Sequence, residues 1–211
     1  MLLFAHTGIT LGLGWLAKEQ AAGRLSTRYS ATALNTTRDV ASPVIPEKHH
    51  SAILQIAADL DLRVLVIGSM LPDIVDKPLG QFILRQSLSN GRIYCHTLLF
   101  LMLLVLAGVF IYRRRQQTGV ILLAAGTITH LIMDEMWRTP QTLLWPLLGL
   151  DFPREELTIS GWLGQMFLEL CNIPRVFVPE AIGFVVLVTF ISVLLKRHVF
   201  ATFLRYGLLN N

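Results

Sequence analysis

The sequence predicts an all-α, polytopic helical membrane protein with about five membrane segments, organised as a single domain over residues 1–211. Of its 211 residues, 53% are hydrophobic and only 15% are charged, whereas a soluble domain usually carries about 25% charged residues. Mean hydropathy is +0.56. The apolar residues also fall into long runs separated by polar connections, as expected for helices in a lipid bilayer.

Five apolar stretches account for the predicted segments. Crossing a bilayer takes about 20 residues, so the first and the last stretch are short. The second is interrupted by Asp59, Asp61 and Arg63. The first lacks the basic start and the cleavage site of a signal peptide, so we expect it to be retained. The five segments are Leu2–Ala17, Ser51–Leu71, Ile93–Tyr112, Gly119–Met136 and Glu180–Leu195.

The connection over residues 18–50 is polar, contains two prolines and shows no convincing period. We expect a loop insertion there. Its adjacent histidines, His49 and His50, have no carboxylate at helical spacing in an apolar frame. They are therefore expected to be solvated loop residues rather than a metal site.

The distribution of basic residues predicts an orientation. Under the positive-inside rule, residues 113–115, residues 196–197 and Arg205 are cytoplasmic, as is the connection over residues 18–50. The N-terminus then lies outside and the C-terminus in the cytoplasm of a cell (inner) membrane, with eleven Lys and Arg residues inside and six outside. Although the pI is near 9.4, the basic residues form no single stripe, so we expect no nucleic acid as a partner.

His130 and Asp134 end the fourth segment and are the most informative pair in the chain. Residues four apart on a helix share one face, with Cβ atoms about 5–6 Å apart. An imidazole and a carboxylate at that spacing can hold one divalent cation, and the nitrogen and oxygen donors suit zinc. Such a pair is otherwise found where a helix end faces water. Its position in or beside an apolar segment favours a functional role, because ionisable residues in lipid are costly.

Ionisable residues of the other segments gather at the same predicted membrane face. Pro72 and Pro78 are expected to end the second helix and to leave two aspartates at its outer mouth. His96 is expected one turn inside the third segment, with Arg92 on its face. The orientation thus predicts one shared polar site at the outer ends of all five segments, formed by His6, Asp73, Asp76, His96, His130, Asp134 and Glu180.

Four short motifs in order resemble the YdjM-like family of membrane-bound metal-dependent hydrolases. They are H-T-x-x-x-x-G from His6, G-S-M-L-P-D-I-V-D-K-P, N-G-R-I-Y-C-H-T and T-H-L-I-M-D followed by L-L-W-P. The family is remotely similar to zinc-dependent phospholipase C and P1-type nucleases. The resemblance implies phosphoester hydrolysis with one or two zinc-type ions. Its implied metal ligands are His6, Asp73, His96, His130 and Asp134. One departure from the common motif L-P-D-x-D is that Val75 intervenes before Asp76.

The expected function is metal-dependent hydrolysis of a phosphoester or another ester at the outer membrane face. The substrate would be a membrane lipid or a small membrane-associated molecule. In this scheme Asp76 or Glu180 takes the proton, and Arg92 holds an anionic substrate oxygen. Two alternatives use the same residues: an ion or proton pathway, and a structural metal that clamps the helices together. The inner halves of segments three to five are almost wholly apolar, which favours a surface-opening site over a pathway.

Overall fold

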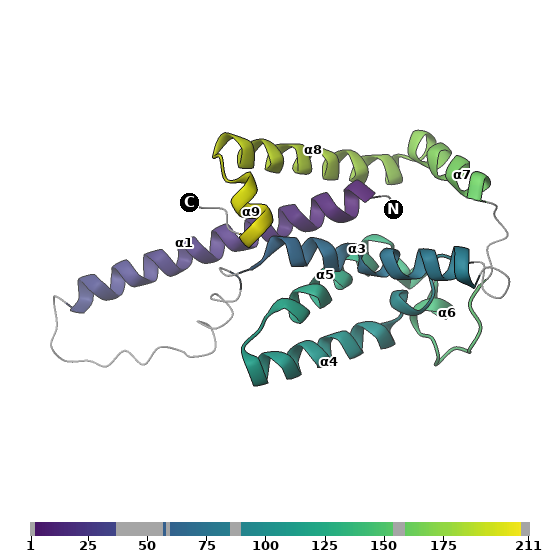
Figure 1. Cartoon of the computed structure of the whole chain (residues 1–211), viewed down its shortest axis with the longest axis horizontal. Coiled ribbons are helices and arrows are strands. Elements are labelled where there is room, and N and C mark those ends of the chain that lie inside the picture. Colours follow the sequence, from purple (N-terminus) through teal and green to yellow (C-terminus); the bar gives the residue numbers. More distant parts are fainter. Residues whose placement is uncertain (1–2, 37–56, 58–59, 85–89, 154–158, 208–211) are drawn as a thin grey trace.

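The computed structural model describes residues 3–36, 57, 60–84, 90–153 and 159–207. Every regular element in these ranges is helical, which confirms the all-α prediction (Figure 1). Short π and 3-10 turns are labelled η. In chain order the elements are η1 (Ala5–Ile9), α1 (Thr10–Thr36), α3 (Leu62–Pro78), η2 (Leu79–Ile83), η3 (Tyr94–His96), α4 (Leu98–Arg115), α5 (Gly119–Met133), η4 (Met136–Arg138), α6 (Pro140–Leu143), α7 (Ile159–Asn172), α8 (Pro174–Lys196) and α9 (Phe200–Tyr206).

Helices α3 and α5 form the centre of the molecule and pack through facing glycines. A Cβ added at Gly68 would lie 2.5 Å from the carbonyl oxygen of Leu123. One added at Gly126 would lie 2.5 Å from the amide nitrogen of Ser69. Small residues allow this approach of two backbones in membrane proteins. As a result, the C-terminal half of α5 lies directly against α3 where both carry polar side chains.

On the other side of α3, η1 and α1 pack against α8 (Figure 1). Gly8 and Gly183 face each other here, and a Cβ on either would collide with the opposite backbone. Towards the far end of α8, an apolar cluster ties α1, α3, α8 and α9 together. Its buried members are Leu11, Leu62, Phe190, Leu194, Val199 and Phe203.

Gly183→Ala is therefore expected to destabilise the protein by about 1–3 kcal/mol, the usual cost of overpacking a close contact. Thermal unfolding of the purified protein would measure the change. Gly23→Ala is the matched control, because a Cβ at Gly23 in α1 meets nothing within 4 Å and alanine favours helix. An unfolding temperature of Gly183→Ala equal to that of Gly23→Ala would contradict the close packing of η1 against α8.

The predicted loop insertion over residues 18–50 is wrong for its first part. Helix α1 continues without a break to Thr36, because residues 18–36 contain no proline and include Lys, Glu, Gln, Arg, Leu and Ala, all strong helix formers. The remainder of that connection, including His49 and His50, lies outside the described residues.

The expectation that Pro72 ends its helix is also wrong, since α3 runs through Pro72 to Pro78. Proline lacks the N–H that would bond the carbonyl of residue i−4, which here is Gly68. The hydroxyl of Thr127 lies 3.2 Å from that carbonyl and 3.0 Å from the carbonyl of Leu123, so α5 supplies a donor that Gly68 shares with Leu123. Consequently Asp73 and Asp76 lie on a helix and not in a turn.

The third segment begins later than expected. Helix α4 starts at Leu98, after Thr97 caps it by accepting a hydrogen bond from the amide of Phe100 at 3.1 Å. His96 therefore lies in the 3-10 turn η3 before the helix, not one turn inside it.

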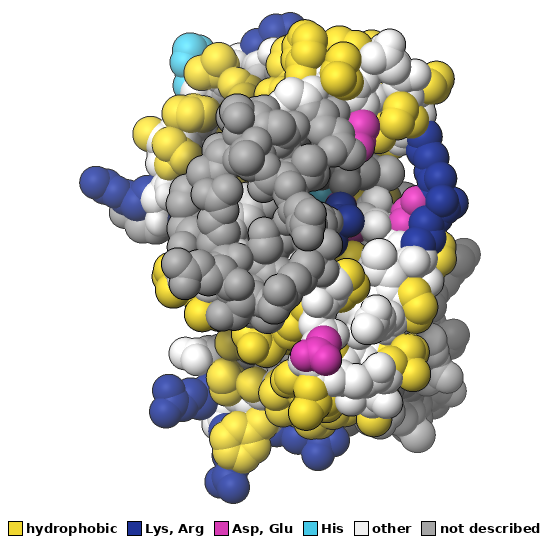
Figure 2. Space-filling view, turned by 90° about the vertical axis from the view of Figure 1, so that its right-hand side faces the viewer, with side chains coloured by type: hydrophobic (Ala, Val, Ile, Leu, Met, Phe, Trp, Pro, Cys, Tyr) yellow, Lys and Arg dark blue, Asp and Glu magenta, His cyan; other side chains and the backbone are white. Residues whose placement is uncertain are grey.

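Apolar helices of the kind found in membranes are present, although the topology with five membrane spans stays a prediction. Within the described residues one helix, α8, is long and apolar enough to cross a bilayer, and α5 is a shorter apolar helix. Large apolar side chains of α4 are exposed, including Leu106 at 57% and Phe110 at 61%. Figure 2 shows one end of the molecule, where Lys, Arg, Asp and Glu side chains lie among hydrophobic ones.

Candidate metal centre

His130 is held in one tautomer by the backbone of α3. Its Nδ1 lies 2.6 Å from the carbonyl oxygen of Ser69, and a carbonyl only accepts, so Nδ1 carries the hydrogen and donates. The Nε2 atom of a neutral His130 then presents its lone pair to the interior of the site. A donor bond of this kind from the second nitrogen is usual for metal-binding histidines.

His96 is held in the same way by Asp76. The Nδ1 atom of His96 donates to Oδ2 of Asp76 at 2.7 Å. The carboxylate of Asp76 is fully buried and also accepts the backbone N–H groups of Ile93, Cys95 and His96 at 2.9–3.2 Å. Asp76 therefore fixes both the η3 turn and the ring of His96, whose Nε2 lone pair is directed away from it.

The two Nε2 atoms meet at 3.2 Å. Because each ring donates its Nδ1 hydrogen elsewhere, two neutral rings would bring two lone pairs together. A proton or a metal cation between them removes this conflict. Burial opposes a charge on His96, but the nearby carboxylate of Asp73 and the hydrogen bond with Asp76 outweigh burial and raise the pKa of His96.

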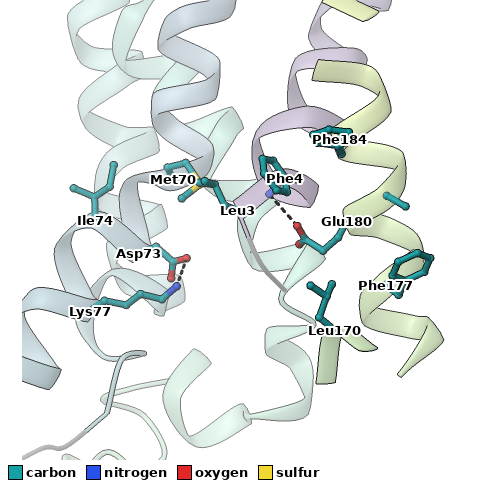
Figure 3. Close-up of a pocket in the computed structure, with 11 residues that line it drawn as sticks. Leu3, Phe4, Met70, Asp73, Ile74, Lys77, Leu170, Phe177, Glu180 and Phe184 are labelled. Atoms are coloured by element: carbon teal, nitrogen blue, oxygen red, sulfur yellow. Dashed lines mark hydrogen bonds and ion pairs between the residues drawn. The ribbon is translucent and has the colours of Figure 1, made fainter. Parts of the chain in front are cut away.

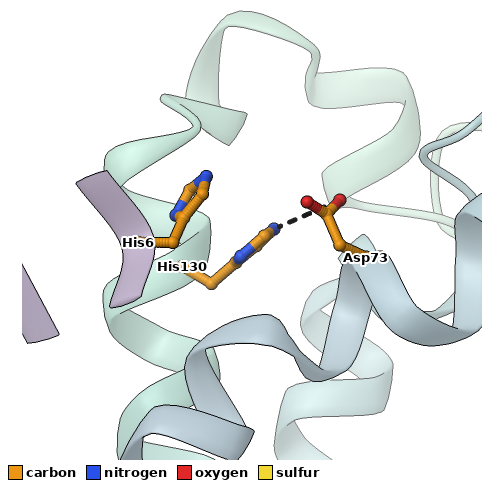
Figure 4. A group of neighbouring side chains, drawn as sticks. All are labelled: His6, Asp73 and His130. Carbon is orange, nitrogen blue, oxygen red and sulfur yellow. Dashed lines mark ion pairs between the residues drawn. The ribbon is translucent and has the colours of Figure 1, made fainter. Parts of the chain in front are cut away.

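Asp73 and His6 complete the group from two further elements. Oδ1 of Asp73 lies 3.6 Å from Nε2 of His96 and 3.9 Å from Nε2 of His130. Its Oδ2 accepts from the Lys77 ammonium at 2.7 Å. The ring of His6 stacks on that of His130 with centroids 4.2 Å apart. Figure 4 shows His6, His130 and Asp73 converging from η1, α5 and α3.

Asp134, at the end of α5, bridges His6 and Arg92. Its Oδ1 lies 3.1 Å from Nε2 of His6, and its Oδ2 accepts from Nε of Arg92 at 3.0 Å. Burial alone would raise the pKa of Asp134, but the bond from His6 and the charge of Arg92 outweigh it and hold that pKa well below its usual range. The ionised carboxylate makes Nε2 of His6 the donor. The remaining nitrogen, Nδ1, is buried without a hydrogen-bond partner among the described residues.

These residues fit a divalent metal. Two overlapping groups have one donor atom per residue within 4.8 Å of one another: His6 with Asp73 and His130, and His96 with His130 and Asp134. Ligand atoms of a tetrahedral zinc ion lie about 3.3 Å apart, as follows from bonds of about 2.0–2.1 Å, so small side-chain shifts suffice. The donor set suits zinc, because it mixes nitrogen and oxygen atoms. Two of its histidines are held in one tautomer, and Nδ1 of His6 has no hydrogen-bond partner among the described residues.

The adjacent thiol is not part of this donor set. Cys95 is buried, and burial together with the nearby charge of Asp76 raises its pKa to about 12. Cys95 also belongs to neither group of potential ligands. Nitrogen and oxygen donors therefore define the centre.

The structure brings together all five residues expected as ligands: His6, Asp73, His96, His130 and Asp134. Arg92 lies at the edge of this group, on Asp134. Asp76 lies behind His96, with both oxygens engaged by N–H groups, which favours an orienting role over the predicted role of proton acceptor. Glu180 accepts the backbone N–H groups of Phe4 and Ala5 at 2.9 and 3.2 Å and so anchors η1 to α8.

Two contributors were missed by reasoning from the sequence. The carbonyl of Ser69 could not be foreseen, because it is a backbone atom exposed to His130 only through helix packing. Lys77 carried a usable signal, since it stands four residues after Asp73, the spacing of a helical ion pair.

Comparison with known families supports the resemblance seen in the motifs. Residues 1–207 match the family described as YdjM inner membrane protein. Neither curated proteins nor solved structures gave a match, so the further likeness to phospholipase C and P1-type nucleases stays an expectation. Since the match covers nearly the whole chain, this protein belongs to the YdjM inner membrane protein family.

Proposed function

We propose that the protein is a membrane-bound, metal-dependent hydrolase that acts on a phosphoester or another ester at the outer membrane face. The observation that carries the proposal is the contact between Nε2 of His96 and Nε2 of His130 at 3.2 Å. Both rings are fixed so that lone pairs face each other, and buried ionisable groups arranged in this way are characteristic of functional sites.

The metal would be held by His6, Asp73, His96, His130 and Asp134. A bound zinc-type ion would supply a hydroxide at neutral pH, because it lowers the pKa of its water from 15.7 to about 7. Asp76 keeps His96 oriented. Arg92 has 38% of its side chain exposed beside Asp134, and a guanidinium has five N–H donors, so it can hold an anionic substrate oxygen.

Glu180 remains the candidate proton acceptor. Its side chain lines the same pocket as Asp73, whereas Asp76 is enclosed behind His96. The five-span, N-outside orientation is part of the proposal. If α8 crosses the membrane, its basic end at Lys196 lies in the cytoplasm under the positive-inside rule, and Glu180 near its other end faces outward.

Detergent-purified protein is expected to carry one or two divalent ions, measured by mass spectrometry of the folded, monodisperse fraction. It should hydrolyse a chromogenic phosphodiester or carboxylester, lose activity on chelation and regain it with zinc. A protein that neither carries nor tightly binds a divalent ion would refute the metal centre. Metal binding without hydrolysis across phosphodiesters, lipids and esters would favour the structural alternative.

A further inference from the structure

A large pocket lies between α3 and α8, next to the candidate metal centre (Figure 3). Its volume is about 750 Å³, within the range of small-molecule sites. It shares Asp73 with the metal centre. The lining residues come from α3, α7, α8 and the two residues before η1, Leu3 and Phe4.

The two long walls have the same pattern. On α3 the lining positions are 70, 73, 74 and 77, and on α8 they are 177, 180, 181 and 184. Each set follows the i, i+3, i+4, i+7 spacing of one helix face. Each stripe has a single carboxylate, Asp73 or Glu180, among otherwise mainly apolar side chains. One face of α3 and one face of α8 therefore form the two long walls of the pocket.

Polar groups in the pocket already bond within the protein. Asp73 pairs with Lys77, and Glu180 binds the backbone of Phe4 and Ala5. A peptide in the pocket would bring backbone N–H and C=O groups that need partners. A hydrocarbon chain needs none, so the lining favours an acyl chain over a polypeptide.

The surroundings indicate access from lipid. Ile74 and Phe177 on opposite walls are 58% and 54% exposed, and α8 is the helix that can cross a bilayer. At the Asp73 end, Lys77 already pairs with Asp73 at 2.7 Å, and a metal bound at the centre would supply the positive charge that attracts a negative group. The pocket is thus apolar along its walls and suited to an anion at one end.

We propose that this pocket binds one acyl chain of a phospholipid, with the phosphate at the Lys77 end beside Asp73. The placement of the phosphate at a reactive centre rests on the proposed hydrolase function. Binding of the acyl chain does not rest on that function, because it depends only on the apolar walls of the pocket. The proposal makes a long-chain phospholipid the substrate class.

Photo-crosslinking tests the proposal with the full chain in phosphatidylcholine nanodiscs. The probe is phosphatidylglycerol with a diazirine near the end of one acyl chain, and labelled peptides are mapped by mass spectrometry. We expect preferential labelling of the walls at Met70, Ile74, Phe177 or Phe184. Ala181→Phe fills the pocket and should reduce this labelling by about tenfold, the size of an overpacking penalty.

Ile182→Phe is the matched control, because residue 182 is about 100° round the helix from Ala181, is 50% exposed and does not line the pocket. Its labelling should equal that of the wild type. Ile74→Trp, on the exposed edge of the other wall, is a second blocking variant if Ala181→Phe does not fold. Labelling spread evenly around α8 and unchanged by both blocking variants would overturn the proposal, because only surrounding bilayer lipid would then be present.

Zinc content measured on the same samples separates the two proposals. Wall labelling in a protein that binds no zinc would leave the lipid pocket standing while the hydrolase fails. Zinc binding with evenly spread labelling would leave the metal centre standing while the lipid pocket fails. Wall labelling together with zinc would support both.

Discussion

His130→Ala is expected to abolish most metal binding, with a loss of affinity well beyond the factor of about 10–100 typical for residues that only support a ligand. His130 is the residue common to both groups of potential ligands. Its ring also separates His6 from His96, stacking on the first and facing the second. Removing it would leave the remaining donors without their central member. Metal per folded molecule, measured by mass spectrometry with zinc titration, gives the result.

Glu135→Gln is the control for this experiment. Glu135 is next to Asp134 but forms ion pairs with Arg138 and Arg175, and it lies outside both ligand groups. Its metal content should match the wild type. Asp134→Glu is expected to retain part of the metal, because a carboxylate remains, and Asp134→Asn little. A His130→Ala protein that is folded and binds zinc as tightly as the wild type would refute the centre.

Asp76→Asn is expected to weaken metal binding by about 10–100-fold and to lower the unfolding temperature. The carboxylate of Asp76 accepts from three backbone N–H groups and from Nδ1 of His96. An asparagine replaces one acceptor oxygen by an NH₂ donor. All four of these donors bond Oδ2, and the amide of Cys95 also lies 3.0 Å from Oδ1. The new NH₂ group therefore faces that buried N–H, at a cost of about 1–3 kcal/mol, and the neutral amide oxygen holds the ring of His96 less firmly than a carboxylate.

Glu180→Gln is the control for Asp76→Asn, because it also removes a buried carboxylate but leaves His96 and its hydrogen bonds unchanged. Its amide oxygen can still accept both N–H groups that Oε2 of Glu180 now accepts. Metal content should therefore stay close to the wild type, while hydrolysis falls if Glu180 takes the proton. Equal metal affinity in Asp76→Asn and the wild type would show that Asp76 does not orient a ligand.

The centre combines residues that are far apart in the chain, from His6 to Asp134, and close helix packing makes this possible. Gly68 and Gly126 bring Ser69 within reach of His130, and Gly8 with Gly183 brings η1 against α8. The site thus depends on backbones that approach without intervening side chains. This explains why substitutions at glycines outside the donor set should affect the centre as well as stability.

The sequence by itself determined the helical class, the family and the residues that meet. Low charge and long apolar runs predict helices in lipid, since a bilayer leaves few other ways to satisfy the backbone. The spacing of His130 and Asp134 places both on one helix face. Assigning orientations to the segments then brings His6, Asp73 and His96 to the same end, because consecutive membrane segments alternate in direction.

Only the tertiary structure decided what each of these residues contacts. Whether Asp76 transfers a proton or orients His96 depends on the four N–H groups around it, three of them from the backbone of residues 93–96. The tautomer of His130 depends on a carbonyl of α3, and the passage of α3 through Pro72 on a hydroxyl of α5. The pocket beside Asp73 likewise exists only where a face of α3 meets a face of α8. Such contacts join residues distant in the chain, and their geometry follows from packing, which local spacing does not encode.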